Sequence, residues 1–233
     1  MEVLKKKSYR ELREICNDMG VHPKSSRQEC LDYIISHRYK KLYQLGNKGR
    51  EARTFLVIDN IDNKEYAMKT YRKNKSTDSM LKEIQFQNYA AKAGISPRIY
   101  DYDTGQAKMI IMEKMEEDLV DIINRQKGKM SVSQQKEVIN IFKTLDAIGV
   151  FHGDANLLNF MSKNNRLYII DYGFSELINT KNVKKYTSNT PNIDFMPIAF
   201  MVQAKRIFPN SKFTYIEKFI KQENASKITL KQI

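Results

Sequence analysis

No uninterrupted apolar stretch of the chain approaches the ~18 residues that a membrane-spanning helix needs. The first seven residues, Met-Glu-Val-Leu-Lys-Lys-Lys, also lack the apolar region of a secretory signal. The two cysteines, Cys16 and Cys30, have no metal-ligand spacing and belong to no disulfide framework. Because isolated thiols are typical of reducing compartments, we expect no membrane span and an intracellular location, cytoplasmic or nuclear. A pairing of the two cysteines stays open.

Acidic residues are too few to balance the basic ones, since 40 Lys and Arg stand against 27 Asp and Glu, a net charge of +13. The cations are spread from Lys5 to Lys231 rather than confined to a tail. Such a field favours polyanions: nucleic acid, nucleotide phosphates or an acidic protein. A merely soluble, lysine-rich surface, as an AT-rich genome would also encode, stays open as the alternative.

The N-terminal segment predicts a hairpin of two helices. Ser8 with Glu11 and Ser26 with Glu29 each form a capping box at the start of an apolar helical pattern. Gly20 breaks the chain between them. A segment of about this size cannot bury much surface on its own.

From residue 42 onward the pattern changes to short strands and then to longer helices. Residues 53–59 are rich in Thr, Phe, Val and Ile, and a turn separates them from a returning strand. The expected elements that follow the first strand are a strand at 65–71, a helix at 78–93, a strand at 108–112 and a helix at 131–148. The sequence therefore predicts a mixed α+β protein.

Two short segments carry the chemistry: H-G-D-A-N-L-L-N at residues 152–159 and I-I-D-Y-G at residues 169–173. They place an Asp and an Asn five residues apart, Asp154 and Asn159, and a second Asp, Asp171, twelve residues later. Carboxylate and amide oxygens are hard ligands that suit Mg²⁺. Neither segment decides anything alone, but their order and distance together are specific.

This spacing resembles the centre of the protein-kinase-like superfamily. The resemblance implies a bilobal protein-kinase-like α+β fold with a reduced C-lobe, preceded by the small helical hairpin. It implies ATP and Mg²⁺ as cofactors. It also implies that Asp154 orients the acceptor hydroxyl and takes its proton, while Asn159 and Asp171 hold the magnesium.

Nucleotide-binding residues follow from the same resemblance. Gly46 and Gly49, in G-N-K-G-R-E-A, resemble the phosphate-covering glycine loop, with one residue inserted and Ala in place of the last Gly. Ala67 and Lys69 are two apart and share one face of their strand. The resemblance sets Ala67 against adenine and Lys69 on the α- and β-phosphates. A plain turn and a solvated lysine are the competing readings.

The same resemblance implies roles for four further residues. Glu83 is the implied carboxylate partner of Lys69, with a surface glutamate as the alternative. Met112 takes the gatekeeper position, and the backbone of Glu113 and Met115 would hydrogen-bond adenine. These last roles belong to the main chain, so residue type says little about them.

The sequence departs from conventional kinases after the catalytic Asp. Asn156 stands where Ser/Thr kinases place a Lys that neutralises the γ-phosphate, which leaves the acceptor open and predicts a lower turnover. The H-G-D form is similar to small-molecule phosphotransferases, RIO kinases and the KEOPS kinase. We expect His152 to be a packed structural residue. No A-P-E follows, and Asp194 is predicted to pin the backbone of the catalytic loop.

Residues 8–36 are similar to the SAP module, a helical element often used to hold DNA; a purely structural brace is the alternative. The predicted domains are the hairpin at 1–40, a kinase N-lobe at 41–115 and a reduced C-lobe at 116–233. Small kinases of this shape also occur in large DNA viruses, which would add viral factories and virions as locations.

The resulting hypothesis is phosphoryl transfer to Ser or Thr of a protein substrate. It includes autophosphorylation, for which Thr187 in a basic segment is one candidate site, and it allows for an activating protein partner. A small-molecule phosphotransferase and a nucleotide-binding, nucleic-acid adaptor without catalysis are the alternatives. The intact set of Lys69, Asp154, Asn159 and Asp171 argues against the adaptor.

Overall fold

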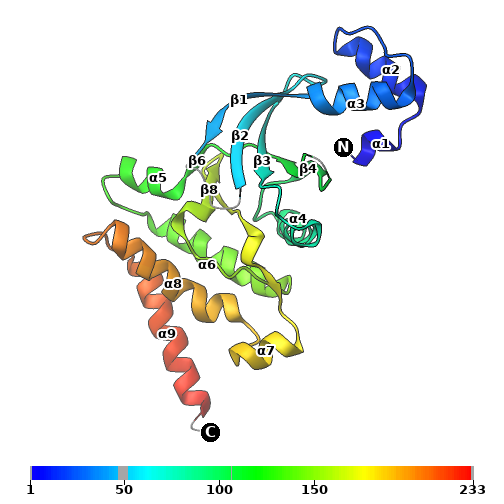
Figure 1. The fold of residues 1–233 in the computed structure, drawn as a ribbon. Helices are drawn as coiled ribbons and strands as arrows, with labels where there is room; N and C mark the ends of the chain where they lie inside the picture. The colour runs from blue at the N-terminus through cyan, green and yellow to red at the C-terminus, as the bar shows by residue number, and fades with distance from the viewer. Residues whose placement is uncertain (1, 47–51, 106, 232–233) are drawn as a thin grey trace. The chain divides into compact units, whose positions relative to one another are not determined.

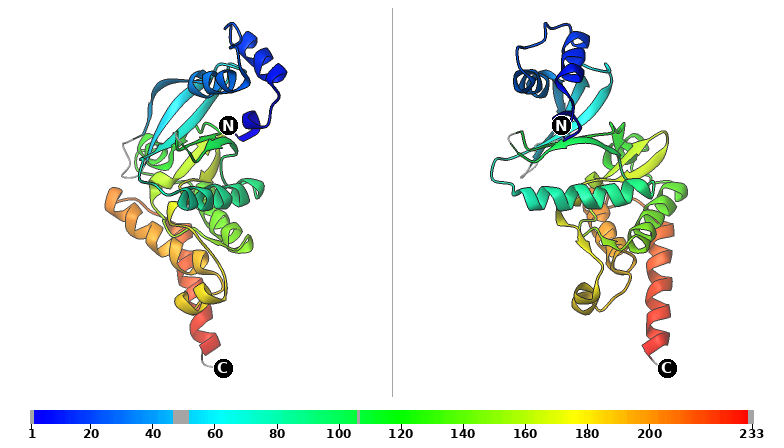
Figure 2. Two further views of the ribbon diagram at one scale, coloured as in Figure 1. Left: turned by 45° about the vertical axis from the view of Figure 1, so that its right-hand side comes forward. Right: turned by 90° about the vertical axis from the view of Figure 1, so that its right-hand side faces the viewer.

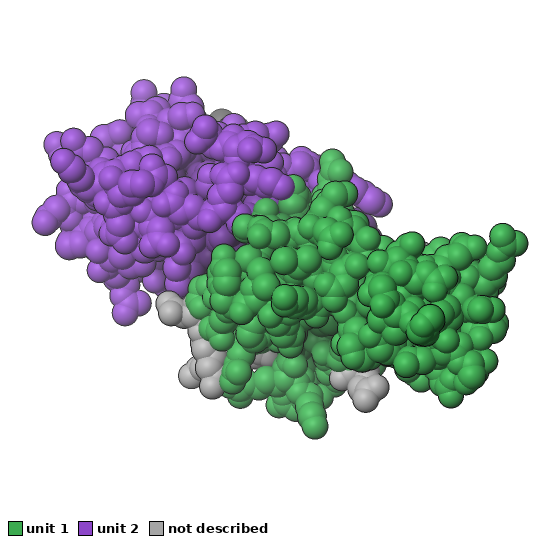
Figure 3. Space-filling view, turned by 90° about the horizontal axis from the view of Figure 1, so that it is seen from above, with its two compact units in different colours: residues 1–81, 98–114 green, residues 82–97, 115–233 purple. Residues whose placement is uncertain are grey.

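The computed structural model describes residues 2–46, 52–105 and 107–231, and it has helices and strands interleaved along the chain (Figure 1). The chain divides into two compact units, coloured separately in Figure 3. Unit 1 consists of residues 1–81 and 98–114, and unit 2 of residues 82–97 and 115–233. The observed α+β architecture agrees with the expected fold class, while the three domain boundaries stay predictions.

Unit 1 is built on a five-stranded antiparallel sheet in the order β1-β2-β3-β5-β4. The strands are β1 (Tyr39–Leu45), β2 (Ala52–Asp59), β3 (Glu65–Tyr71), β4 (Ile99–Asp103) and β5 (Met109–Met112). The predicted pair of β2 and its returning strand is confirmed, with Phe55 opposite Met68. The β3–β5 register then places Ala67 opposite Met112 and Lys69 opposite Ile110.

The N-terminal hairpin contains α1 (Glu2–Lys5), α2 (Tyr9–Asp18) and α3 (Arg27–His37), and Figure 2 shows it from two directions. Both predicted capping boxes are present: Ser8 accepts from the backbone N–H of Glu11, and Ser26 from that of Glu29. These bonds satisfy N–H groups that the first turn of a helix otherwise leaves unpaired.

The apolar face of the hairpin shares one hydrophobic core with the sheet of unit 1. The members of this core are Leu4, Leu12, Cys16, Cys30, Leu31 and Ile34 of the hairpin and Val57, Met68, Met109 and Ile111 of the sheet. Cys16 and Cys30 are free thiols in it. Since the hairpin alone buries too little to be stable, the sheet supplies the neighbour that it needs.

Arg38 fastens the junction between α3 and β1. Its guanidinium donates from Nε to Asp59 Oδ2 at 2.9 Å and from Nη1 to Asp101 Oδ2 at 3.0 Å. Both carboxylates are buried, and a paired, hydrogen-bonded arrangement is what makes a buried charge tolerable. The hairpin is therefore joined to the sheet by polar as well as apolar contacts.

Unit 2 is mainly helical. Its helices are the larger part of α4 (Thr77–Lys92), α5 (Leu119–Arg125), α6 (Val132–Ala147), α7 (Thr180–Tyr186), α8 (Pro191–Ile207) and α9 (Thr214–Lys231). Short strands and two 3₁₀ turns connect them: β6 (Glu117–Asp118), β7 (Val150–Phe151), η1 (Leu157–Asn159), β8 (Phe160–Lys163), β9 (Arg166–Ile169), η2 (Tyr172–Phe174) and β10 (Glu176–Leu177).

The core of unit 2 gathers around α6. The buried face of this helix carries Val138, Ile141, Phe142 and Leu145. Phe160 packs edge-to-face on Phe142, with ring centroids 5.9 Å apart. A rigid core below the loop that follows β7 is what allows that loop to hold a fixed geometry. In the part of the chain that the structure describes, no helix is long and apolar enough to cross a bilayer.

Candidate active site

The loop between β7 and β8 brings together the two residues that the sequence places five apart. Asn159 Nδ2 donates to Asp154 Oδ2 at 2.9 Å, and Asn156 N donates to Asp154 Oδ1 at 3.1 Å. Both carboxylate oxygens are therefore held by donors from the same loop. Asp154 is half-buried, so the carboxylate is fixed but still reachable.

His152 supports this loop from below. It is fully buried, and its Nε2 lies 3.1 Å from the carbonyl oxygen of Ile170. Because a carbonyl only accepts, Nε2 carries the hydrogen, and Nδ1 is left to accept from Asp154 N at 3.4 Å. Burial lowers the pKa of His152, which keeps the ring neutral. The histidine is a packed structural residue, as predicted.

Gly153 is required by the turn that carries Asp154. Its φ is +81°, a left-handed conformation that side chains rarely adopt. A Cβ at this position would also lie 2.8 Å from the carbonyl oxygen of Phe174. The Gly of the H-G-D segment therefore has both a conformational and a steric cause.

Asp171 follows β9 and is placed beside the same loop by the backbone. Ile170 N donates to Asn159 O at 2.9 Å, which ties the two segments together. Asp171 itself has φ 68° and ψ 76°, and its Oδ1 accepts from Gly173 N at 3.4 Å. A left-handed aspartate is a strained conformation of the kind that gathers at functional sites.

Glu83 of α4 places a second carboxylate close to Gly173, two residues after Asp171. A Cβ on Gly173 would lie 3.3 Å from Asp171 Oδ1 and 3.8 Å from Glu83 Oε2. Glu83 is buried at 2% exposure, so the reading as a surface glutamate is wrong. Its predicted pairing with Lys69 stays a prediction.

Asn156, the residue in the usual lysine position, has a visible local role. Its Oδ1 accepts from Leu158 N at 3.1 Å and so caps the 3₁₀ turn η1. Its backbone N–H is the one that binds Asp154. A neutral capping side chain therefore stands where conventional kinases have a Lys, and it shapes the loop.

Asn192 anchors the catalytic loop, and the anchoring role expected of Asp194 stays a prediction. His152 N donates to Asn192 Oδ1 at 3.0 Å, whereas Asp194 accepts from Ser188 Oγ at 2.6 Å. The Nδ2 of Asn192 donates to Asp146 Oδ1 at 2.7 Å and to Val150 O at 2.8 Å. A carboxylate could not make the last two bonds, because it only accepts.

Asp146 was missed by the sequence analysis. It sits near the end of α6 and accepts from the backbone N–H of Asn192 and of Ile193, at 3.0 and 2.9 Å. Both N–H groups lie in the first turn of α8, where the helix itself offers no acceptor and a negative charge is favoured. Burial nevertheless raises the pKa of Asp146. No local motif in the sequence marks this contact, since its partners are some 46 residues away.

The nucleotide-binding residues predicted in unit 1 lie on β3 and its neighbours. Ala67 is buried, and the ammonium of Lys69 lies 5.4 Å from the ring centroid of Tyr71 on the same strand face. Met112 faces Ala67 across the β3–β5 pair and is buried. Gly46 follows β1 with a φ of +62°. This confirms that Ala67 and Lys69 share one face, while their contacts to a nucleotide stay predictions.

The remaining nucleotide residues are less informative. Glu113 N donates to Arg98 O at 2.8 Å, so an adenine contact of Glu113 would fall to its carbonyl oxygen. Met115 belongs to unit 2 and is buried. Gly49 lies outside the described residues.

The oxygen ligands near Asp154 suit a magnesium ion that also binds phosphate oxygens. The Nδ2 of Asn159 is bound to Asp154, which leaves the amide oxygen as the group for a cation. Asp171 supplies one carboxylate. Among the described residues, no group of three or more His, Cys, Asp and Glu side chains is placed to hold a metal unaided. Mg²⁺ usually takes only one or two carboxylates and fills its shell with water and substrate oxygens.

Comparison with known families matches residues 39–197 to the protein kinase domain. This match spans more than half of the chain, and the chain belongs to the protein kinase family. Over 155 residues it is 28% identical to Serine/threonine-protein kinase PRR2 of Saccharomyces cerevisiae, an alignment that covers 62% of this chain and 22% of that kinase. The chain thus corresponds to about a fifth of the length of this relative.

Proposed function

We propose that the chain is a serine/threonine protein kinase that transfers the γ-phosphoryl group of ATP with the help of Mg²⁺. Its family already implies phosphoryl transfer, ATP and a protein substrate. The observation that carries the proposal is the carboxylate of Asp154, held through both oxygens by Asn156 and Asn159, with Asp171 tied to the same loop.

Asp154 is the proposed base. Phosphoryl transfer needs little covalent help, so positioning and charge neutralisation dominate. The two donors on Asp154 hold its carboxylate in one orientation, ready to align the acceptor hydroxyl and to take its proton late in the transfer. His152 is excluded as a competing base, because it is fully buried and hydrogen-bonded on both nitrogens.

Asn159 and Asp171 are the proposed magnesium ligands, and Lys69 is the proposed partner of the α- and β-phosphates. A bound Mg²⁺ would neutralise phosphate charge during the transfer. Asn156 supplies no positive charge at the position of the usual lysine, so we expect a slower chemical step than in conventional kinases. We infer from this residue and from the H-G-D form that the chain is a compact atypical kinase of the RIO or KEOPS type.

A protein acceptor is favoured over a small molecule by the name of the yeast relative. The net charge of +13 also argues against a cationic small molecule such as an antibiotic. An activating protein partner remains part of the proposal, because the lost lysine predicts a weak isolated enzyme.

The test is transfer of labelled phosphate from Mg·ATP to the protein itself and to a generic basic protein. Wild type is compared with Asp154→Asn and Asp171→Asn, and Asp121→Asn is the matched control because Asp121 is exposed on α5. We expect transfer in the wild type and the control and a loss of at least about a hundredfold in the other two. Equal transfer by all four would contradict the proposal.

A tether to nucleic acid is the weakest part of the function that the sequence predicted. Residues 1–37 carry seven Lys and Arg against six Asp and Glu, whereas residues 38–75 carry eleven against four. The hairpin is thus almost neutral, and its apolar face packs against the sheet. These facts support the structural brace. Salt-dependent DNA binding that is lost in Arg10→Glu/Arg13→Glu would instead support the SAP-like role.

A further inference from the structure

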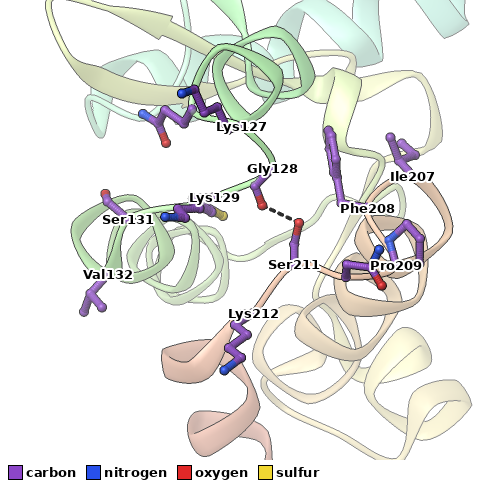
Figure 4. A pocket seen from close by; sticks show the side chains of 13 residues that line it. Lys127, Gly128, Lys129, Ser131, Val132, Ile207, Phe208, Pro209, Ser211 and Lys212 are labelled. Carbon is purple, nitrogen blue, oxygen red and sulfur yellow. Dashed lines mark hydrogen bonds between the residues drawn. The ribbon is translucent and has the colours of Figure 1, made fainter.

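A groove of about 970 Å³ lies in unit 2 (Figure 4). Its walls are two connections: residues 126–132, between α5 and α6, and residues 207–212, between α8 and α9. None of its lining residues belongs to the site around Asp154. The volume is at the upper end of the ~300–1,000 Å³ range of ligand pockets.

One hydrogen bond joins the two walls, and a second one fixes Ser211 on its own wall. Ser211 Oγ donates to the carbonyl oxygen of Gly128, a bond drawn in Figure 4. Lys205 Nζ donates to Ser211 O at 2.6 Å from within α8. Gly128 has a φ of +79°, and an added Cβ would meet Ser211 Oγ at 3.3 Å. The groove is therefore a built feature of the fold.

Its floor and part of its rim are apolar. Met130 and Phe208 are buried beneath it. Val132 and Ile207 stand at its edge with 50% and 45% of their surface exposed. An exposed apolar patch that is edged by polar residues is typical of a protein interaction site. A ligand with a bulky apolar side chain would remove this surface from water.

Three lysines surround this apolar floor: Lys127, Lys129 and Lys212. All three are exposed, and within the described part of the chain none of their ammonium groups forms an ion pair. The lining residues, all of which the structure describes, include no Asp or Glu. The field over the groove is therefore positive and uncompensated.

We propose that this groove is a docking site for an acidic segment of a partner protein, which inserts a Leu or Phe side chain onto Met130 and Phe208. The carboxylates of that segment would pair with Lys127, Lys129 and Lys212. The proposal goes beyond phosphoryl transfer, and its test needs no nucleotide, so it stands or falls independently of the catalytic assignment.

Apolar floor and basic rim together favour a peptide over a nucleic acid. Single-stranded nucleic acid binds by stacking bases on exposed aromatic side chains. The aromatic residue in the groove, Phe208, is buried at 8% exposure and offers no such platform. A polyanion without an apolar group would use the lysines and leave Val132 and Ile207 in water.

The test is binding of fluorescein-labelled peptides to the full chain, measured by fluorescence anisotropy. The first peptide has Leu and Phe flanked by glutamates, the second has Gly in place of Leu and Phe, and the third has Lys in place of Glu. We expect the first to bind at least about tenfold more tightly than either other peptide, and its affinity to fall as salt rises.

Two triple variants test whether the lysines of the groove bind the peptide. Lys127→Glu/Lys129→Glu/Lys212→Glu reverses the rim, and Lys92→Glu/Lys143→Glu/Lys221→Glu makes the same change of net charge at exposed lysines outside the groove. The rim variant should bind the first peptide roughly tenfold more weakly, because repulsion from three glutamates replaces three exposed ion pairs. The control variant should bind like the wild type, and thermal unfolding checks that both are folded.

A variant of the apolar edge separates the effect of charge from the effect of apolar contact. Ile207→Ser should weaken the Leu/Phe peptide and leave the Gly peptide unchanged. Equal weakening by the rim and control triples would overturn the proposal, since the binding would then reflect net charge alone. A glycine peptide or a single-stranded oligonucleotide that binds the wild type as tightly as the Leu/Phe peptide would overturn it as well.

Discussion

Asn192 is fully buried, and its side chain joins three segments: it accepts from His152 N and donates to Asp146 Oδ1 and Val150 O. Replacement by aspartate keeps the size and the acceptor for His152 but removes both donated bonds. The new carboxylate would face Asp146 across a gap that measures 2.7 Å from nitrogen to oxygen in the wild type. The substitution thus changes chemistry at nearly constant volume.

The cost of Asn192→Asp follows from these contacts. Val150 O is left without its buried donor, a loss of about 1–3 kcal/mol. Two carboxylates in hydrogen-bond contact cannot both ionise freely, so one must take up a proton. We expect the free energy of unfolding to fall by about 2–5 kcal/mol at neutral pH, and the catalytic loop to lose its anchor.

The pH dependence of Asn192→Asp is a second signature. Burial already raises the pKa of Asp146, and a neighbouring carboxylate would raise it further. A group whose folded pKa is raised gives its stability at low pH and loses it as pH rises. The deficit should therefore shrink as pH falls from neutral towards 5.

The assay is urea unfolding of wild type and Asn192→Asp across this pH range, with Asn140→Asp as the control. Asn140 is exposed on α6, so its change adds the same charge without a buried contact. A variant at Asn192 that is as stable as the wild type at neutral pH would refute the anchoring role. So would a deficit that does not change with pH.

Three further outcomes are expected. Gly153→Ala should destabilise the chain by about 2 kcal/mol and impair phosphoryl transfer, because its φ of +81° and the carbonyl of Phe174 oppose a Cβ; Gly94→Ala, where nothing lies within 4 Å, checks the steric part. Burial lowers the pKa of His152, so the free energy of unfolding should fall by up to about 1.4 kcal/mol per pH unit as pH drops below about 6.5. Unfolding of His152→Gln, measured across the same pH range, should lack this slope. A slope that persists in the variant would contradict the assignment to His152. Ile34→Ala should cost about 2–5 kcal/mol and reduce hydrogen-exchange protection in β2 and β3, which share its core; unchanged protection there would mean that hairpin and sheet are independent.

Much of the fold could be predicted because its signals are local. The capping boxes at Ser8 and Ser26 need only residues three apart, and β3 was expected at the residues where the structure has it. The pairing of Asp154 with Asn159 is likewise a contact within one loop.

The parts that could not be predicted depend on contacts between distant segments. The hydrogen bonds of Asn192 and Asp146 join residues about 40 or more positions apart. The sequence around Asn192 does not show that its side chain both accepts and donates there. The docking groove forms from two connections whose linking bond, from Ser211 to Gly128, spans 83 residues. The sequence of the hairpin alone does not show which sheet residues cover its apolar face.

The central claim is that Asp154 directs phosphoryl transfer to protein hydroxyl groups. The most direct measurement is phosphoamino-acid analysis of the proteins labelled by the full chain with radiolabelled ATP, with and without Mg²⁺ and with Asp154→Asn in parallel. The account predicts phosphoserine or phosphothreonine that requires Mg²⁺ and disappears with Asp154→Asn. Label that is absent from Ser and Thr, or that persists undiminished in the folded Asp154→Asn variant, would contradict it.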